Sequence, residues 1–145
     1  MPDTKNSQNS QTIIGFDYGL KHIGVAVGQT LTKTAEPVAI FKAKDGIPQW
    51  CDIEKLLAQW QPDYLVVGLP LNMDGSESDM SVRARKFANR LHGRFGLRVE
   101  TIDERLSSYA AKAELAENQQ GQVRRDKTID AIAARLILES WLATH

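Results

Sequence analysis

IIGFDYGLKHIGVAVG, residues 13–28, predicts two strands joined by a tight turn. Its β-branched residues suit a pleated sheet, and the small residues between them let another element pack closely. Asp17 ends the first of these strands, and the turn 18–21 follows it. A carboxylate in this position is costly to bury unless it is paired, hydrogen-bonded or bound to a metal. The groups that lie opposite Asp17 therefore decide its role.

Composition indicates one ordinary globular domain. The chain has 145 residues, of which 42% are hydrophobic and 25% are charged, and this length is sufficient for a core. Its 18 basic residues balance its 18 acidic ones, so nucleic-acid binding would need a local basic patch. The single cysteine excludes an internal disulfide and a cysteine-based zinc site. No apolar run approaches the roughly 18 residues of a membrane span, and we expect a cytoplasmic protein without a membrane partner. Residues 1–12 are polar and are predicted to be a disordered lead-in, followed by a single domain over 13–145.

The rest of the chain alternates predicted strands and helices. Three further strands are expected at 35–41, 64–69 and 97–102, and helices at 48–60, 80–95, 107–118 and 128–142. Short links between the first three strands indicate an antiparallel meander, and the later strands pair in parallel through right-handed crossovers. We predict an α/β fold, with a mixed five-stranded sheet and helices on both faces. Three tryptophans are expected in the core rather than on a base-stacking platform: Trp50, Trp60 and Trp141.

Three acids fall at comparable places in this scheme. Asp17 ends the first strand, Glu104 follows the fifth, and Asp130 opens the last helix. Because ligands of open α/β sheets gather beyond the carboxyl ends of the strands, these acids are candidates for one cleft. Their charges repel each other unless a cation neutralises them, and Mg²⁺ or Mn²⁺ prefers such oxygen ligands. A site of this kind can activate water for phosphodiester hydrolysis, so the three acids are predicted to be both catalytic and metal-binding.

Each acid also has a simpler interpretation. Asp130 can complement the dipole of its helix, Glu104 can form a surface ion pair, and Asp17 can hydrogen-bond its own turn. Asp126 competes with Asp130 for the third place. We interpret Asp126 as a helix cap, because it precedes the apolar run.

Basic side chains gather on one predicted helix and near the carboxylate edge. On the helix 80–95 they form a basic stripe with the spacing i, i+3, i+7 and i+11, which suits either a solvated face or phosphate contact. The members of this basic stripe are Arg83, Lys86, Arg90 and Arg94. The loop after the fourth strand offers the donors Asn72, Ser76 and Ser78, and Gly68 allows close approach of the backbone, although an ordinary connecting loop fits equally well. Nucleic-acid contacts are predicted at Lys21, Asn72, Arg83, Lys86, Arg90, Arg94, Arg105, Arg124, Arg125 and Lys127.

Several ordered motifs resemble the YqgF family, also called RuvX. They are FDYGLKHIGVAVG, VVGLPLNMDGSES, ARKFANRLHGRFG, DERLSS and IDAIAARLILESWL, and together they span about residues 13–142. The resemblance implies a ribonuclease H-like fold with strand order 3-2-1-4-5, and a magnesium-dependent nuclease related to RuvC-type Holliday junction resolvases. Family members are described as such resolvases and as nucleases that mature the precursor of small-subunit ribosomal RNA. The family's acids fall here on Asp17, Glu104 and Asp130.

The chain departs from the family pattern in two places. His22 stands where many members carry arginine, which weakens one basic contact. The fourth strand ends in Gly68-Leu69-Pro70, without the carboxylate of RuvC-type resolvases. The second metal ligand must then come from Glu104, one strand further out.

Three functions fit these features. The first is a metal-dependent endonuclease, for which RNA is a better substrate than DNA junctions. The second is a Holliday junction resolvase, which needs a dimer; nothing in the sequence marks a dimer interface, so we expect a monomer or a weak dimer. The third is a non-catalytic RNA-binding factor in ribosome assembly, which would not need three acids. A sugar-kinase-like ATPase half also opens with a strand, an aspartate and a glycine turn, but it needs a second domain.

Overall fold

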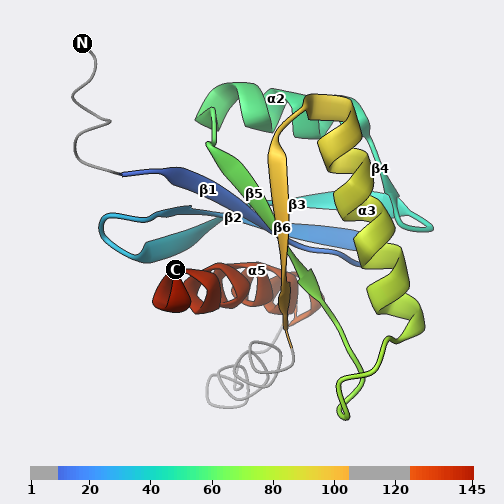
Figure 1. Ribbon diagram of the computed structural model, residues 1–145. Helices are drawn as coiled ribbons and strands as arrows, with labels where there is room; N and C mark the ends of the chain where they lie inside the picture. The colour runs from blue at the N-terminus through green and yellow to red at the C-terminus, as the bar shows by residue number, and fades with distance from the viewer. Residues whose placement is uncertain (1–9, 105–124) are drawn as a thin grey trace.

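The computed structural model describes residues 10–104 and 125–145, with only the backbone described in 125–131. Its sheet has six strands in the order β4-β3-β2-β1-β5-β6, with helices on both faces (Figure 1). The strands are β1 Thr12–Asp17, β2 His22–Gln29, β3 Thr34–Lys44, β4 Ile47–Pro48, β5 Tyr64–Leu69 and β6 Arg98–Asp103. The helices are α2 Trp50–Trp60, α3 Asp79–Phe95 and α5 Arg125–Thr144.

The strand pairing confirms the predicted α/β class. The strands β1 to β4 form an antiparallel meander, and β1, β5 and β6 are parallel. The predicted order 3-2-1-4-5 corresponds to β3-β2-β1-β5-β6. Parallel pairing brings the carboxyl ends of β1, β5 and β6 to the same edge of the sheet.

A short sixth strand, β4, was not predicted, and it corrects the predicted beginning of a helix at Pro48. Asp45 and Gly46 have φ angles of 54° and 81°, which is the backbone of a two-residue hairpin turn. The turn lets Ile47 and Pro48 pair with the end of β3. A proline is tolerated there because β4 is an edge strand, and α2 begins only at Trp50.

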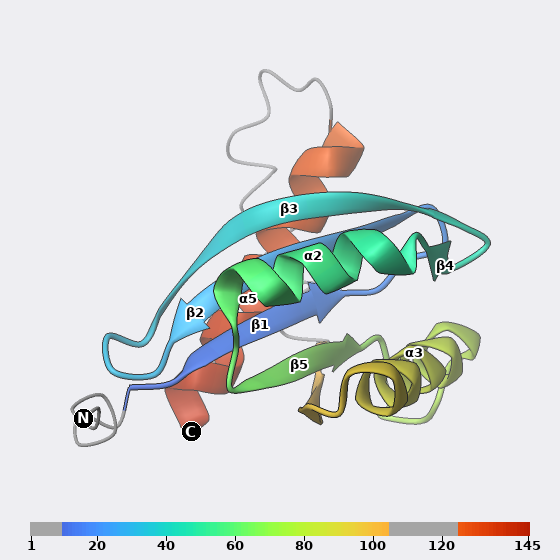
Figure 2. The same ribbon diagram turned by 90° about the horizontal axis from the view of Figure 1, so that it is seen from above.

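Two apolar clusters form the core, one on each face of the sheet. Because side chains alternate along a strand, Ile14 and Phe16 of β1 pack in the cluster that includes α2 and α3, whereas Ile13 packs under α5. Figure 2 shows α2 and α5 crossing β1 on opposite sides. Trp141 of α5 lies in the core, whereas Trp50 and Trp60 are only half-buried at its margin.

The last helix begins three residues earlier than predicted, at Arg125. Asp126 is therefore the second helical residue and not a cap. Asp130 lies in the second turn, beyond the first turn in which a carboxylate complements the helix dipole. The predicted helix at 107–118 lies outside the described residues. None of the helices that the structure describes is long and apolar enough to cross a membrane.

Candidate active site

Two of the three predicted acids meet at the carboxyl edge of the parallel strands. Asp17 is the last residue of β1, and Glu104 directly follows β6, with β5 between these two strands. The amide of Glu104 donates to the Leu69 carbonyl at 3.1 Å, which ties Glu104 to the end of β5. The Asp17 and Glu104 carboxyl groups are hydrogen-bonded to each other. Side chains from two strands that are not neighbours therefore form one pair.

Gly68 provides the space in which Glu104 reaches Asp17. A Cβ atom on Gly68 would lie 2.8 Å from Glu104 Oε1 and 2.6 Å from Ile137 Cδ1. Glycine is needed here because the Glu104 carboxylate and α5 both lie against the backbone of β5. The sequence suggested that Gly68 lets a phosphate approach, but protein atoms occupy that space.

The electrostatic environment of Glu104 differs from that of a surface acid. Its side chain is buried, with 8% of the residue exposed, and this burial raises the pKa of the Glu104 carboxyl to about 7. The charge of Asp103 raises this pKa further, whereas the hydrogen bond with Asp17 opposes the shift. A buried side chain in contact with a second carboxyl group is not half of a surface ion pair. Carboxyl groups this close share a proton unless a cation takes its place.

The course of α5 brings Asp130 toward the same edge. Trp141 Nε1 donates to Tyr64 Oη at the beginning of β5, at 2.9 Å, and Ile137, one turn earlier, lies against Gly68 near the end of β5. Further toward its N-terminus, α5 therefore passes the carboxyl ends of the strands. Asp130 lies two turns, or about 10 Å, before Ile137 on the same helical face. The Asp130 side chain lies outside the described residues, so its place in the site stays a prediction.

The donor set suits a hard divalent cation. Two carboxyl groups in contact offer oxygen ligands of the kind that Mg²⁺ and Mn²⁺ prefer. In the part of the chain whose side chains are described, no three acids, histidines or cysteines are grouped closely enough to hold a metal. Asp130 stays the predicted third ligand.

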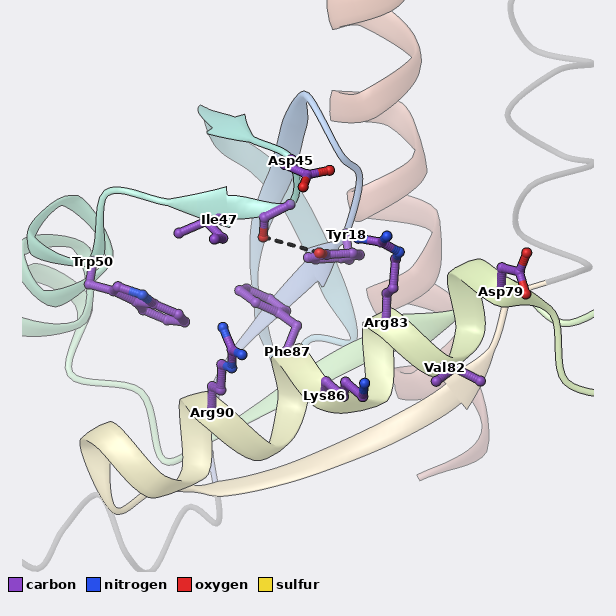
Figure 3. Close-up of a pocket in the computed structure, with 11 residues that line it drawn as sticks. Tyr18, Asp45, Ile47, Trp50, Asp79, Val82, Arg83, Lys86, Phe87 and Arg90 are labelled. Carbon is purple, nitrogen blue, oxygen red and sulfur yellow. Dashed lines mark hydrogen bonds between the residues drawn. The ribbon is translucent and has the colours of Figure 1, made fainter.

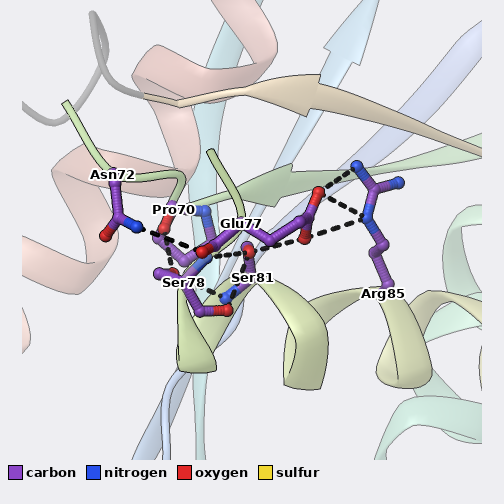
Figure 4. A network of polar contacts seen from close by, with 6 residues as sticks. All are labelled: Pro70, Asn72, Glu77, Ser78, Ser81 and Arg85. Carbon is purple, nitrogen blue, oxygen red and sulfur yellow. Dashed lines mark hydrogen bonds and ion pairs between the residues drawn. The ribbon is translucent and has the colours of Figure 1, made fainter. Parts of the chain in front are cut away.

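The loop between β5 and α3 is organised by its own polar side chains (Figure 4). The Asn72 side-chain amide donates to Ser76 Oγ and to the Glu77 carbonyl, both at 3.0 Å. Ser78 caps α3 by accepting from the Ser81 amide at 3.0 Å, and its hydroxyl donates to the Pro70 carbonyl at 2.6 Å. Asn72, Ser76 and Ser78, proposed above as phosphate donors, thus make hydrogen bonds within the loop.

An ion pair locks this loop onto α3. Arg85 Nη2 lies 2.8 Å from Glu77 Oε2, and the Ser81 hydroxyl donates to Glu77 Oε1 at 2.7 Å. These contacts lower the pKa of the exposed Glu77 carboxyl, chiefly through the Arg85 hydrogen bond. The loop therefore fixes where α3 begins, and with it the direction of the basic stripe.

Three members of the basic stripe line a cavity on the α3 side of the sheet, opposite Tyr18 (Figure 3). Arg83, Lys86 and Arg90 border a space of about 580 Å³, and no described acid forms an ion pair with them. Arg94 lies beyond them, with its guanidinium carbon 4.3 Å from the centre of the Trp50 ring. The cavity is the feature that sequence analysis missed, because its walls come from three separated segments.

The remaining predicted contacts are spread along the chain. Lys21 is exposed in the turn after Asp17. Arg105 and Arg124 lie outside the described residues, and the side chains of Arg125 and Lys127 are also outside them. His22, at the arginine position of the family pattern, is half-buried at the start of β2.

Solved structures of resolvases share this fold. Thermus thermophilus RuvC in complex with a Holliday junction substrate superposes with a TM-score of 0.54 and 15% identity, covering 92% of this chain and 97% of RuvC. The fowlpox virus Holliday junction resolvase gives a TM-score of 0.54 and 16% identity, covering 92% of this chain and 99% of the resolvase. At such identities the likeness shows the fold alone, and this chain therefore has the ribonuclease H-like fold of these resolvases.

Sequence comparison then gives the family. A family model described as "RuvX: Holliday junction resolvase" matches residues 11–144, and the chain belongs to this family. A relative from Aeromonas hydrophila subsp. hydrophila is 58% identical over 92% of this chain and 96% of its own length. One from Pectobacterium carotovorum is 56% identical over 91% and 95%. Both relatives carry the name "Putative pre-16S rRNA nuclease".

Proposed function

We propose that this chain is a divalent-metal-dependent endonuclease that hydrolyses the precursor of small-subunit ribosomal RNA. The observation that carries the proposal is the hydrogen-bonded pair Asp17 and Glu104, one of them buried, at the carboxyl edge of three parallel strands. Such a pair is costly to bury and has a clear use as a cation site. The names of the close relatives support RNA as the substrate.

The chain's own residues build a rigid hydrolytic site. A divalent cation bound by Asp17, Glu104 and Asp130 would supply positive charge to activate water and to stabilise the leaving oxygen. Asp17 fixes the position of the site because β1 is flanked by β2 and β5. The water oxygen bonds to phosphorus and the bond from phosphorus to the leaving sugar oxygen breaks. The proton of the water passes to solvent, and the leaving oxygen takes one from solvent.

The basic stripe would hold the substrate. Arg83, Lys86 and Arg90 face solvent on α3 and lack ion pairs with any described acid. Their charges can therefore neutralise phosphates, which releases counterions and favours binding at low salt. Because the net charge of the whole chain is zero, this local stripe would direct the nucleic acid toward one face.

One cleavage assay tests the proposal and its nearest rival. The purified full chain is given Mg²⁺ and offered precursor ribosomal RNA and four-way DNA junctions side by side. We expect RNA cleavage that stops when divalent metal is removed, and binding without cleavage in Ca²⁺, a poorer Lewis acid with looser geometry. Cleavage of junctions alone would favour a resolvase, as the family description suggests. Binding of RNA without cleavage of either substrate would favour a ribosome-assembly factor.

A further inference from the structure

The cavity between α3, Tyr18 and the turn at Asp45 and Gly46 has aromatic and apolar walls. Phe87 forms its floor with 3% of the residue exposed, and the Tyr18 and Trp50 rings lie 5.0 and 6.0 Å from the Phe87 ring, centre to centre. At the rim, Ile47 is 53% exposed and Val82 43% exposed. The half-buried Tyr18 and Trp50 rings leave aromatic surface on which a base can stack, since every base has a π-face.

The cavity is held open by hydrogen bonds between two turns. The Tyr18 hydroxyl donates to the Gly46 carbonyl at 3.0 Å, and the Gly46 amide donates to the Leu20 carbonyl at 2.9 Å. A side chain at Gly46 would meet the Tyr18 hydroxyl, and the φ of 81° also favours glycine. The Tyr18 ring is therefore fixed before any ligand arrives, which lowers the cost of binding.

Charge around the cavity suits a strand of nucleic acid. Arg83, Lys86 and Arg90 lie along the α3 side, and Asp45 and Asp79 are the acids of the lining. The three cations can follow successive phosphates. The Asp45 carboxylate, on the opposite turn, accepts hydrogen bonds and so suits the amino group of a base.

We propose that this cavity binds an unstacked base of a single-stranded stretch of the substrate. The inference deepens the proposed function and rests on it. Tyr18 directly follows Asp17, but its ring packs with the α2 and α3 cluster, whereas the Glu104 carboxylate that contacts Asp17 lies beside Ile137 of α5. A strand that reaches both places would therefore cross the carboxyl edge of the sheet between them. A base paired and stacked in a duplex does not reach a recessed aromatic floor, whereas a splayed base does. The site would therefore select single-stranded or looped RNA.

The test removes the base and leaves the phosphates. The wild-type full chain is titrated in Ca²⁺ with short single-stranded oligoribonucleotides, each carrying one abasic residue at a different position. We expect one position at which the abasic residue weakens binding by on the order of tenfold. The salt dependence should not change, because no phosphate contact is lost. A duplex of the same sequence should bind more weakly than the single strand.

Matched variants assign the effect to the cavity. Trp50→Leu should abolish the difference between the intact and the abasic strand, whereas Trp60→Leu, also on α2 but outside this cavity, should retain it. Equal binding of all abasic strands, or of duplex and single strand, would overturn the proposal. RNA cleavage without base dependence would reject the cavity and leave the nuclease. Base-dependent binding without any cleavage would reject the nuclease and leave the cavity.

Discussion

Glu104 can contact Asp17 only by crossing the backbone of β5, and Gly68 is the residue over which it does so. The end of β5 carries no carboxylate, but Gly68 leaves the space through which Glu104 supplies one. A Cβ atom at Gly68 would meet both the Glu104 carboxylate and Ile137. The geometry of the acid pair therefore depends on Gly68, although Gly68 has no side chain that could take part in catalysis.

We predict that Gly68→Ala reduces cleavage at least tenfold, because it displaces the Glu104 carboxylate from Asp17. Cleavage rate and free energy of unfolding should be measured on the same preparation. Gly93→Ala is the matched control, since nothing lies within 4 Å of a Cβ there. This control should retain full activity and gain about 1 kcal/mol of stability, because alanine is the better helix former. Wild-type activity in Gly68→Ala would contradict the role assigned to Gly68.

The buried Glu104 carboxyl also predicts how stability depends on pH without metal. Its pKa is about 7 in the folded chain, against an ordinary value of 4.5 for a glutamate in the unfolded chain, so the folded state holds the proton more tightly. Stability is then highest below about pH 4.5 as far as this group is concerned, and falls as pH rises to about 7. The loss is on the order of 3 kcal/mol.

Urea unfolding in EDTA across this pH range measures the effect. Glu104→Gln, which stays neutral, should flatten the decline. Mg²⁺ added above pH 7 should restore stability to the wild-type chain, because the cation favours the ionised pair. If the stability of the wild-type chain changed with pH in the same way as that of Glu104→Gln, Glu104 would ionise freely and this prediction would be wrong.

At the scale of elements, α3 connects the polar loop to the basic stripe. Ser78 caps the helix and also donates to the Pro70 carbonyl. Ser78→Ala should cost about 1 to 2 kcal/mol of unfolding free energy, because it removes the cap acceptor and leaves the Pro70 carbonyl without this donor. Thermal or urea unfolding checks the value. Ser78→Thr should restore most of the loss, and an unchanged midpoint in Ser78→Ala would remove the cap from the account.

Neutralising Arg83 and Arg90 to glutamine should weaken RNA binding and reduce its salt slope by about one unit or more. Stability should change by less than about 0.5 kcal/mol per site, because both side chains are exposed. Lys55→Gln on α2 removes one positive charge outside this cavity and should leave the slope unchanged. An unaltered slope in the double variant would return the stripe to an ordinary solvated face.

Local patterns predicted most of these elements. The continuous apolar run of β5 and the i, i+3, i+4 spacing of α2 and α3 follow from burial on two faces or on one stripe. The strand β4 was missed although Asp45-Gly46 is a strong hairpin signal, because only two residues follow it before α2. The start of α5 was placed too late because its first turn is polar and the prediction followed apolar periodicity.

At the scale of the whole molecule, the sheet edge was predictable and the cavity was not. Parallel pairing of β1, β5 and β6 follows from the alternation of strands and helices, and it brings Asp17 and Glu104 together. The cavity needs Tyr18, Trp50 and Phe87 to meet across three segments. Trp50 was predicted as a core residue because its helical position is apolar, but at the first turn of α2 it lies at the margin of the core and lines the cavity. Contacts between side chains so far apart in the sequence cannot be predicted from a short sequence pattern.

In the proposed mechanism, the Asp17 carboxylate holds the cation at which the phosphodiester is hydrolysed. The most direct test of this role is the cleavage rate of Asp17→Asn, measured beside its RNA affinity and its fold. Asparagine keeps the shape and removes one negative charge, so cleavage should be abolished while the fold remains. Binding should be unchanged or tighter, because a charge that repels phosphate is gone. Wild-type cleavage by well-folded Asp17→Asn, free of contaminating nuclease, would contradict the account.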